Sequence, residues 1–568
     1  MNAGPTASRS ELHPNLSLGN LDPFGILPAY MEVVRAWGQA PQQLQDRFNE
    51  FFSGLLKVQH QVAERAVGHF VPDFVPAVSY DERFQDKAWI ESPWFDLLKE
   101  YYLLCTRAIE DAIYATPEVP EKTRRRAAFW ARQALNAVSP SNFLWTNPIA
   151  LTRFIATGGM SLAEGYKLWV NDLASNDIRM VDDEALTLGT DIAATPGQVV
   201  YRNDLMEVIQ YGPATTQVRR TPVVIVAPWI NKYYVLDLSP DKSLVRYLVN
   251  QGFTVFITSW KNPDGAMGDT RFDDYLTRGA ATIIDVARAI CGVDTVHAVG
   301  YCIGWTLLSA LMAWYARGGG ATPVSSWTLL TTLIDFDSPG DIDAFITDDG
   351  IRYIEERMAA NGYLDGGEMG GTFRWLRPNS LIWRYVIHNY LYGEEPPPMD
   401  VLQWNVDCTR LPKAMHSFYL REFYLRNRLI VPDDLVLAGR AIDLRLIEAP
   451  AYVVGTEQDH IAPWKETFKI AGLVRGPVRY TLATSGHILG ILSAPVTPPK
   501  RRYWSGDASG ARDAEAWRTG IEKTAGSWWE DWSRWLGGQC GDLVAAREPG
   551  SAAHPPLAAA PGTYVLEK

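Results

Sequence analysis

The feature that most constrains the fold is a series of short apolar, β-branched runs separated by helical segments. The runs lie at 199–201, 206–211, 223–227, 254–259, 295–299, 327–333, 451–455 and 479–483. Strands that are buried on both faces read as continuous apolar runs, and parallel strands need a crossover between them, usually a helix. The pattern therefore predicts a mainly parallel sheet with helices on both faces.

The fifth run leads into the pentad Gly-Tyr-Cys-Ile-Gly at 300–304, and an apolar helical segment at 305–315 follows. A nucleophile elbow is a sharp strand-to-helix turn that needs small flanking residues, so that strand and helix can approach closely. Most free cysteines are only small buried hydrophobes. This placement instead indicates that Cys302 is a nucleophile that attacks a carbonyl group.

Two partners for Cys302 follow later strands. Asp459 comes after the run at 451–455, and His487 comes after the run at 479–483. The order nucleophile, acid, histidine is that of the α/β-hydrolase fold. His487 is the expected base, and Asp459 would fix its tautomer and support the imidazolium. A lone aspartate or histidine in a loop is usually a turn former or a structural residue, so their joint placement carries the prediction.

Other residues compete for these roles. Asp335 and Asp337 follow the sixth run, where some hydrolases of this fold carry the acid. His460 lies beside Asp459, where it is either a second contact in the site or a plain loop residue. The sequence leaves these alternatives open.

The oxyanion of an acyl-transfer intermediate needs backbone N–H donors. One is expected from Ile303, the residue after the nucleophile. The other is expected from the loop at 227–238, where Ile230 is the candidate and Asn231 comes next. Ile230 and Ile303 are therefore the predicted substrate-binding residues.

The rest of the chain divides around this catalytic region. Residues 1–27 are predicted to be disordered, because they are rich in Ser, Asn, Pro and Gly and show no periodicity. Residues 28–190 are predicted to form a helical N-terminal domain. The catalytic domain would span 191–500, with a cap inserted at about 335–442, where the strand rhythm disappears. Residues 501–568 are expected to form a C-terminal extension.

Composition excludes several classes of protein. The formal net charge of −12 argues against a nucleic-acid binder. The five cysteines are scattered and lack metal-ligand spacing, which predicts a reducing compartment and no metal. No signal-peptide pattern and no apolar run long enough to span a bilayer occurs, so a cytoplasmic protein is expected.

Several segments together resemble the polyhydroxyalkanoate synthases of the single-subunit type. They are Asp-Glu-Arg-Phe-Gln-Asp-Lys-Ala-Trp at 81–89, Thr-Asn-Pro at 146–148, Gly-Gly-Met-Ser-Leu at 158–162, Pro-Trp-Ile-Asn-Lys-Tyr-Tyr-Val-Leu-Asp at 228–237, the pentad, Asp-His-Ile-Ala-Pro-Trp at 459–464, Ser-Gly-His at 485–487 and Ala-Pro-Gly-Thr-Tyr-Val at 560–565. The resemblance runs from about residue 81 to residue 568.

The resemblance implies a helical N-terminal domain followed by an α/β-hydrolase domain. It implies polymerisation of (R)-3-hydroxyacyl-CoA with release of CoA and no separate cofactor. By resemblance, Cys302 carries the chain as a thioester, His487 activates the thiol, and Asp459 assists in activating the 3-hydroxyl group. It also implies a homodimer and an association with polyester granules in the cytoplasm.

One residue departs from the family pattern, and the effect of a second cannot be read from it. Trp305 stands where the family usually has a second glycine, which predicts a difference in either the helix packing or the shape of the acyl pocket behind Cys302. Leu489 lies at a position associated with acyl-length preference. Short-chain substrates, with 3-hydroxybutyryl-CoA first, are weakly favoured over medium-chain ones.

Two rival functions remain. An acyl-CoA thioesterase or acyl hydrolase of the same fold would give the acyl group to water. A non-catalytic granule-surface protein would fit the 21 tryptophans of the chain, but it leaves the ordered Cys, Asp and His without a purpose.

Overall fold

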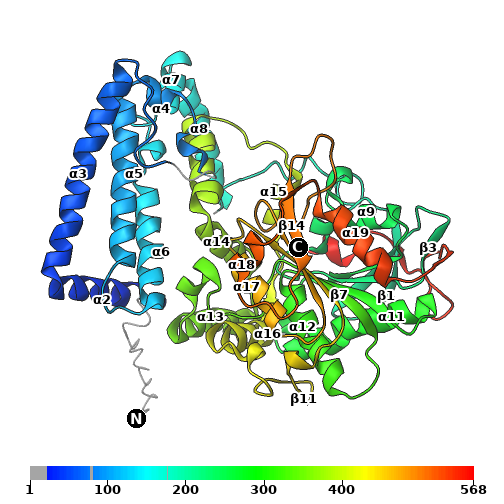
Figure 1. Ribbon diagram of the computed structural model, residues 1–568. Coiled ribbons are helices and arrows are strands. Elements are labelled where there is room, and N and C mark those ends of the chain that lie inside the picture. The colour runs from blue at the N-terminus through cyan, green and yellow to red at the C-terminus, as the bar shows by residue number, and fades with distance from the viewer. Residues whose placement is uncertain (1–21, 77–80, 176) are drawn as a thin grey trace, which may run out of the picture.

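The computed structural model describes residues 22–76, 81–175 and 177–568. The first part is helical and stands beside the rest of the molecule (Figure 1). Its helices are α2 (Ile26–Gln39), α3 (Pro41–Ala66), α4 (Ala88–Glu91), α5 (Pro93–Tyr114), α6 (Glu121–Ala137), α7 (Pro148–Ala156) and α8 (Met160–Ser175). Proline at the first position of α3, α5 and α7 has the fixed φ of a helix start and lacks an N–H that would go unpaired there. Residues 1–21 of the predicted disordered segment lie outside the described residues, and α2 already begins at Ile26.

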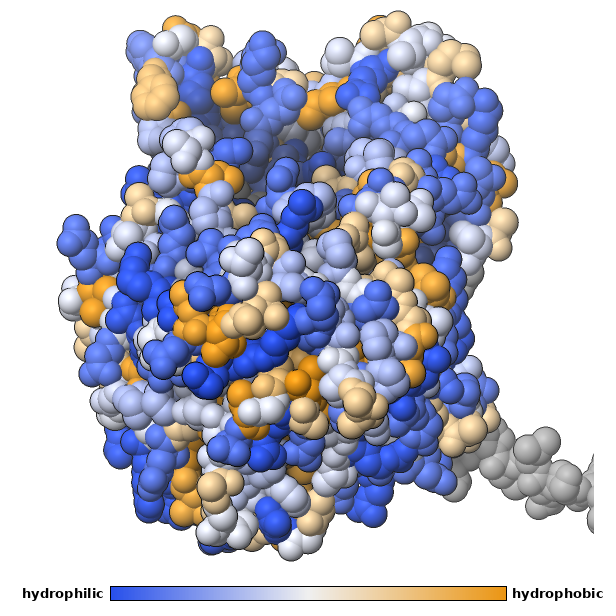
Figure 2. Space-filling model, turned by 90° about the vertical axis from the view of Figure 1, so that its right-hand side faces the viewer, coloured by the Kyte–Doolittle hydropathy of each residue, from blue (hydrophilic) through white to orange (hydrophobic). Residues whose placement is uncertain are grey.

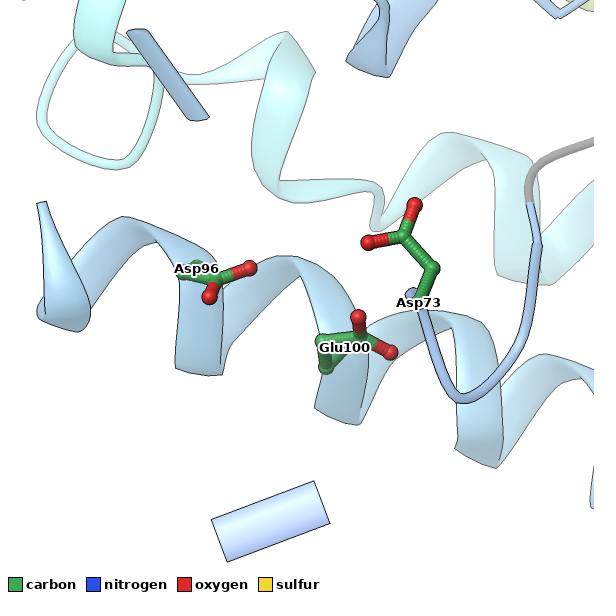
Figure 3. A group of neighbouring side chains, drawn as sticks. All are labelled: Asp73, Asp96 and Glu100. Carbon is green, nitrogen blue, oxygen red and sulfur yellow. The ribbon is translucent and has the colours of Figure 1, made fainter. Parts of the chain in front are cut away.

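A partly buried group of charges lies between α3, α5 and the loop after α3. Three acidic side chains, Asp73, Asp96 and Glu100, come close together (Figure 3). Arg65 donates to Asp96 at 2.7 Å and to Glu100 at 2.9 Å, and the Lys99 Nζ lies 2.9 Å from an Asp73 oxygen. The two cations balance most of the negative charge, so we interpret the group as an ion-pair network that ties α3 to α5.

The second part of the molecule is built on one large sheet. Its strand order is β15-β14-β13-β12-β7-β6-β4-β5-β2-β1-β17. The strands are β1 (Gly197–Arg202), β2 (Met206–Tyr211), β4 (Val223–Val226), β5 (Val255–Trp260), β6 (Val296–Tyr301), β7 (Val324–Leu330), β12 (Ala451–Thr456), β13 (Val478–Ala483), β14 (Arg502–Asp507), β15 (Thr524–Ala525) and β17 (Ala558–Ala559). From β5 to β13 all neighbours are parallel. The predicted α/β-hydrolase fold is confirmed.

Residues 501–568 join this sheet at both edges. Strand β14 pairs antiparallel with β13, and β17 pairs antiparallel with β1. These strands lack the continuous apolar runs of the central sheet, because an antiparallel strand can keep one face near solvent and its residues then alternate. The burial of β14 alternates accordingly. This is why the sequence pattern set the segment apart as an extension.

Alternate residues of the central strands point to opposite faces of the sheet. Val224 and Val226 of β4 face a core shared with α11 (Thr282–Cys291) and α12 (Ile303–Arg317). Val223 and Ile225 face a second core, shared with α9 (Leu244–Asn250) and α19 (Trp528–Gln539). Each face is thus covered by helices.

Between β7 and β12 the chain is mostly helical, in the region where a cap was predicted. It contains α13 (Asp348–Asn361), α14 (Gly366–Leu376), α15 (Asp400–Val406), α16 (Lys413–Phe418) and the π-helical turns η8 (Asn379–Trp383), η9 (Val386–Leu391) and η10 (Tyr419–Leu425). Helix α8 of the N-terminal part packs on η9. A Cβ added to Gly165 would lie 2.0 Å from the Tyr390 carbonyl oxygen, and the Tyr390 hydroxyl donates to Asp172 at 2.7 Å.

The remaining short elements complete the fold. They are α10 (Phe272–Asp274), α17 (Trp464–Phe468), α18 (Ala514–Thr519), β3 (Gln217–Arg219) with β16 (Leu543–Ala545), β8 (Tyr363–Leu364) with β9 (Leu411–Pro412), and β10 (Val436–Leu437) with β11 (Arg440–Ala441). Among the described residues, no helix combines the length and apolarity that crossing a membrane requires.

Candidate active site

The turn between β6 and α12 has the geometry of a nucleophile elbow. Cys302 has φ 51° and ψ −131°, a strained conformation for a non-glycine residue. Its N–H donates to the Leu330 carbonyl of the adjacent strand at 3.0 Å. A Cβ at Gly300 would lie 2.6 Å from the Trp305 Cα, and one at Gly304 would lie 2.3 Å from the Val226 oxygen. The two glycines are therefore required by the close approach of helix and sheet.

The structure brings His487 and Asp459 together. The His487 Nδ1 lies 2.8 Å from the Asp459 Oδ2, and both side chains are buried. The other Asp459 oxygen accepts from the N–H groups of Ile461 and Ala462, at 2.9 and 2.8 Å. Asp459 is thus held in place by its own loop. Because Asp459 contacts Nδ1, the His487 Nε2 is the ring nitrogen that can interact with Cys302.

The charges of the three side chains reinforce one another. Burial alone would lower the pKa of His487, but Asp459 and Cys302 together raise it to about 10. Burial would raise the pKa of Asp459, and the charge of His487 with the hydrogen bonds holds it below the ordinary value instead. The His487 imidazolium is therefore stable beside the Asp459 carboxylate at neutral pH.

The competing residues have other partners. An Asp335 oxygen lies 2.9 Å from the Lys469 Nζ, and Asp335 also accepts from Asn427 at 2.8 Å. The Asp337 N–H donates to the Asp335 Oδ1 at 3.0 Å. His460 lines the same cavity as Cys302, with its Nδ1 buried and without a hydrogen-bond partner among the described residues. Geometry favours Asp459 as the acid.

Of the two expected oxyanion donors, Ile303 directly follows Cys302 in the chain, and Ile230 lines the same cavity as Cys302. Ile303 begins α12, where N–H groups have no partner within the helix. The Ile230 carbonyl group accepts a hydrogen bond from the Thr409 N–H at 3.0 Å. Asn231 is turned to the inserted region, where its Nδ2 donates to the Cys408 Sγ at 3.3 Å.

A cavity of about 390 Å³ opens above Cys302. It is lined by the loop after β4, the elbow, the loops after β12 and β13, and helices α14 and α15 of the inserted region. Cys302 and His487 face this cavity, whereas Asp459 lies behind His487. The arrangement can take an acyl group onto sulfur within a largely apolar chamber.

The chain is similar to known proteins over most of its length. Residues 80–248 match the family described as "Poly-beta-hydroxybutyrate polymerase (PhaC) N-terminus". The poly(3-hydroxyalkanoate) polymerase of Methylorubrum extorquens is 42% identical, over 94% of this chain and 89% of its own. The polymerase subunit PhaC of Cupriavidus necator is 39% identical, over 93% of this chain and 89% of its own. The chain belongs to the poly(3-hydroxyalkanoate) polymerases.

The polymerase is therefore an acyltransferase of polyester synthesis, as the resemblance implied. Among solved structures, a monoacylglycerol lipase of Paleococcus ferrophilus is similar to this chain. It is 13% identical, the alignment covers 59% of this chain and 98% of the lipase, and the TM-score is 0.32.

The two departures of this polymerase lie in different surroundings. Trp305 is fully buried in the core under α12. It packs behind the elbow instead of facing the acyl cavity. Leu489 is 42% exposed and lines the cavity. Of the two, only Leu489 can contact an acyl chain directly.

Sequence reasoning missed the residues that hold His487 in place. The Tyr301 ring stacks on the His487 ring, with centroids 5.7 Å apart. Behind the histidine loop, the indole N–H groups of Trp528 and Trp529 donate to the carbonyls of Gly490 and Ile491, at 2.9 and 2.8 Å. The buried tryptophans of α19 could be expected to pack on a core, but no pattern linked them to this loop.

Proposed function

We propose that this polymerase condenses (R)-3-hydroxyacyl-CoA monomers through a thioester on Cys302, with 3-hydroxybutyryl-CoA as the first substrate. The observation that supports this most strongly is the placement of Cys302 on a strained elbow in the same cavity as His487, which is held by buried Asp459. No cofactor is needed, because the CoA thioester is already activated.

In the first step, the Cys302 sulfur attacks the thioester carbonyl of the monomer. The N–H groups of Ile303 and Ile230 stabilise the oxyanion. The bond to the CoA sulfur then breaks, and the leaving thiolate takes the proton of the His487 imidazolium. Exchange of the acyl group between two sulfurs leaves a thioester that still reacts with an alcohol.

In the second step, the 3-hydroxyl oxygen of another acyl unit attacks the Cys302 thioester. Neutral His487 accepts the hydroxyl proton, an ester bond forms, and the bond to the Cys302 sulfur breaks. Asp459 acts through His487, since its oxygens face His487, Thr456 and backbone N–H groups. Helices α14 and α15 limit the access of water.

The change Asp459→Asn should slow elongation more than acylation. During acylation the Cys302 thiolate also supports the imidazolium, but during elongation that charge is consumed in the thioester. We expect about a tenfold loss in acylation and at least about a hundredfold loss in elongation. The pKa of His487 should also fall, because Asp459 raises it, and the high-pH limb of the acylation rate should move to lower pH. A burst of CoA release followed by slow turnover, recorded across pH, checks this; equal losses in both steps would contradict it.

The rival reading is a thioesterase, and one assay separates the two. Purified protein is incubated with (R)-3-hydroxybutyryl-CoA, and free CoA and product mass are followed together. Release of CoA with high-mass polyester is the expected result. Release with only 3-hydroxybutyric acid would favour the thioesterase.

We also propose that the N-terminal helices contact the surface of a polyester granule. Most of the large exposed hydrophobic side chains lie between residues 27 and 173. Phe48, Phe52 and Leu56 of α3 are 50%, 59% and 68% exposed and follow one another at four-residue spacing on one helical face. The opposite side of the molecule is mainly hydrophilic, with small separate hydrophobic patches (Figure 2).

Replacing Phe52 and Leu56 together by Glu should reduce co-sedimentation with amorphous poly(3-hydroxybutyrate) particles about tenfold. The change removes exposed apolar area and puts two negative charges in its place. The matched control is the double change Gln42→Glu and Gln43→Glu, on the same helix. Equal binding of the two variants would contradict the proposal. Light scattering of both variants tests the predicted homodimer at the same time.

A further inference from the structure

A second cavity, of about 330 Å³, lies between the N-terminal helices and the inserted region. Residues 82–86 and 147–153 form one side, and residues 379–392 form the other. Three arginines line it, Arg83, Arg153 and Arg384, against two carboxylates, Glu82 and Asp86. The mechanism above uses none of these residues.

Two of the arginines are available to an anionic ligand. Arg153 and Arg384 are 42% and 43% exposed, and each pairs with an exposed carboxylate, Glu394 and Glu82 respectively. Exposed ion pairs of this kind contribute little free energy. A phosphate can therefore replace the carboxylate and gain bidentate, charge-assisted hydrogen bonds from the guanidinium.

The third arginine is fixed. Arg83 is buried and donates to both oxygens of Asp81, at 2.9 and 2.7 Å. It shapes the floor of the cavity instead of exchanging partners. Burial of this pair keeps the segment at residues 82–86 in place against the N-terminal helices.

The cavity also has walls suited to a heterocyclic base. Tyr392 is a buried aromatic whose ring centroid lies 4.6 Å from the Arg153 guanidinium, and Ile149 and Ile387 add apolar surface. The Asn379 Oδ1 is buried and has no hydrogen-bond partner among the described residues. An exocyclic amine would satisfy this acceptor, whereas an inorganic anion would leave it unpaired.

The second cavity adjoins the catalytic one. Ser380 lines both, while its neighbour Leu381 lines the catalytic cavity and Asn379 lines the second. All three belong to η8, a single helical turn. A ligand that is held in the second cavity by a phosphorylated adenosine can thus extend past η8 towards Cys302.

From these observations we infer that the second cavity binds the nucleotide end of the acyl-CoA substrate. Arg153 and Arg384 contact its phosphates, and Asn379 contacts the adenine amine. The inference rests on the proposed function, since it assumes that acyl-CoA is the monomer donor. It gives the N-terminal helices a part in substrate binding.

The test compares two substrates that differ only in the nucleotide, (R)-3-hydroxybutyryl-CoA and (R)-3-hydroxybutyryl-pantetheine. Arg153→Gln and Arg384→Gln should each raise the KM for the CoA thioester about tenfold and leave the KM for the pantetheine thioester within about twofold. Arg107→Gln is the matched control, because Arg107 is an exposed arginine of α5, paired with Asp111. It should change neither KM.

A binding measurement completes the test. Adenosine 3′,5′-bisphosphate should compete with acyl-CoA in the parent protein and about tenfold more weakly in Arg153→Gln and Arg384→Gln. Equal changes for both substrates, or no change for either, would overturn the inference while leaving the polymerase activity intact. If the parent protein released no CoA from any acyl-CoA, the proposed function itself would fail.

Discussion

Replacing Cys302 by Ala should reduce CoA release at least about a thousandfold. The side chain that we propose to form the covalent bond would be gone, and removal of a nucleophile is among the most damaging changes in an acyl-transfer site. Cys408 lines the same cavity but cannot replace Cys302 as the nucleophile. Burial raises the pKa of the Cys408 thiol to about 11, and this thiol donates a hydrogen bond to the Asn405 carbonyl. The measurement is the initial rate of CoA release from (R)-3-hydroxybutyryl-CoA.

The control is Cys105→Ala, which removes a half-buried thiol from α5 of the N-terminal part. It should release CoA at the parent rate. Alanine fits the elbow as well as cysteine does, so the thermal unfolding of Cys302→Ala should be close to that of the parent. Turnover near the parent rate in Cys302→Ala would mean that the nucleophile lies elsewhere.

Replacing His487 by Gln should lower the rate of CoA release by about a thousandfold. Glutamine keeps a polar group near Asp459 but can neither hold the Cys302 proton nor deliver it to the leaving CoA. The thiolate would also lose the positive charge that stabilises it. Rates should be measured at several pH values, because a purely structural role would lower the rate equally at all of them.

His60→Gln is the matched control, since His60 lies on the exposed face of α3, far from the cavity in the sequence and the fold. Its rate should equal that of the parent. A small loss in His487→Gln, of tenfold or less, would indicate that another base activates Cys302.

Much of the catalytic part could be predicted because its signals are local. A buried parallel strand must be continuously apolar, and a nucleophile elbow must have glycine on both sides of its central residue. Glycine is required at 300 and 304, because a Cβ at Gly300 would clash with Trp305 and a Cβ at Gly304 would clash with Val226. The chain order of Cys302, Asp459 and His487 then follows from the order of the strands.

The supporting contacts could not be predicted, because they join residues far apart in the chain. Nothing near Trp528 or Trp529 indicates that their indoles hold the loop after His487. The choice between Asp335 and Asp459 was open for the same reason. It depends on Lys469 and Asn427, which reach Asp335 only in the folded chain.

The central claim is that the growing chain is carried on the Cys302 sulfur. The most direct measurement is peptide mass spectrometry of the protein, quenched with acid shortly after mixing with (R)-3-hydroxybutyryl-CoA. The peptide that contains Cys302 should gain the mass of one or more 3-hydroxybutyryl units, and hydroxylamine should remove them. An unmodified Cys302 peptide during active CoA release, or an adduct on Cys408, would contradict the claim.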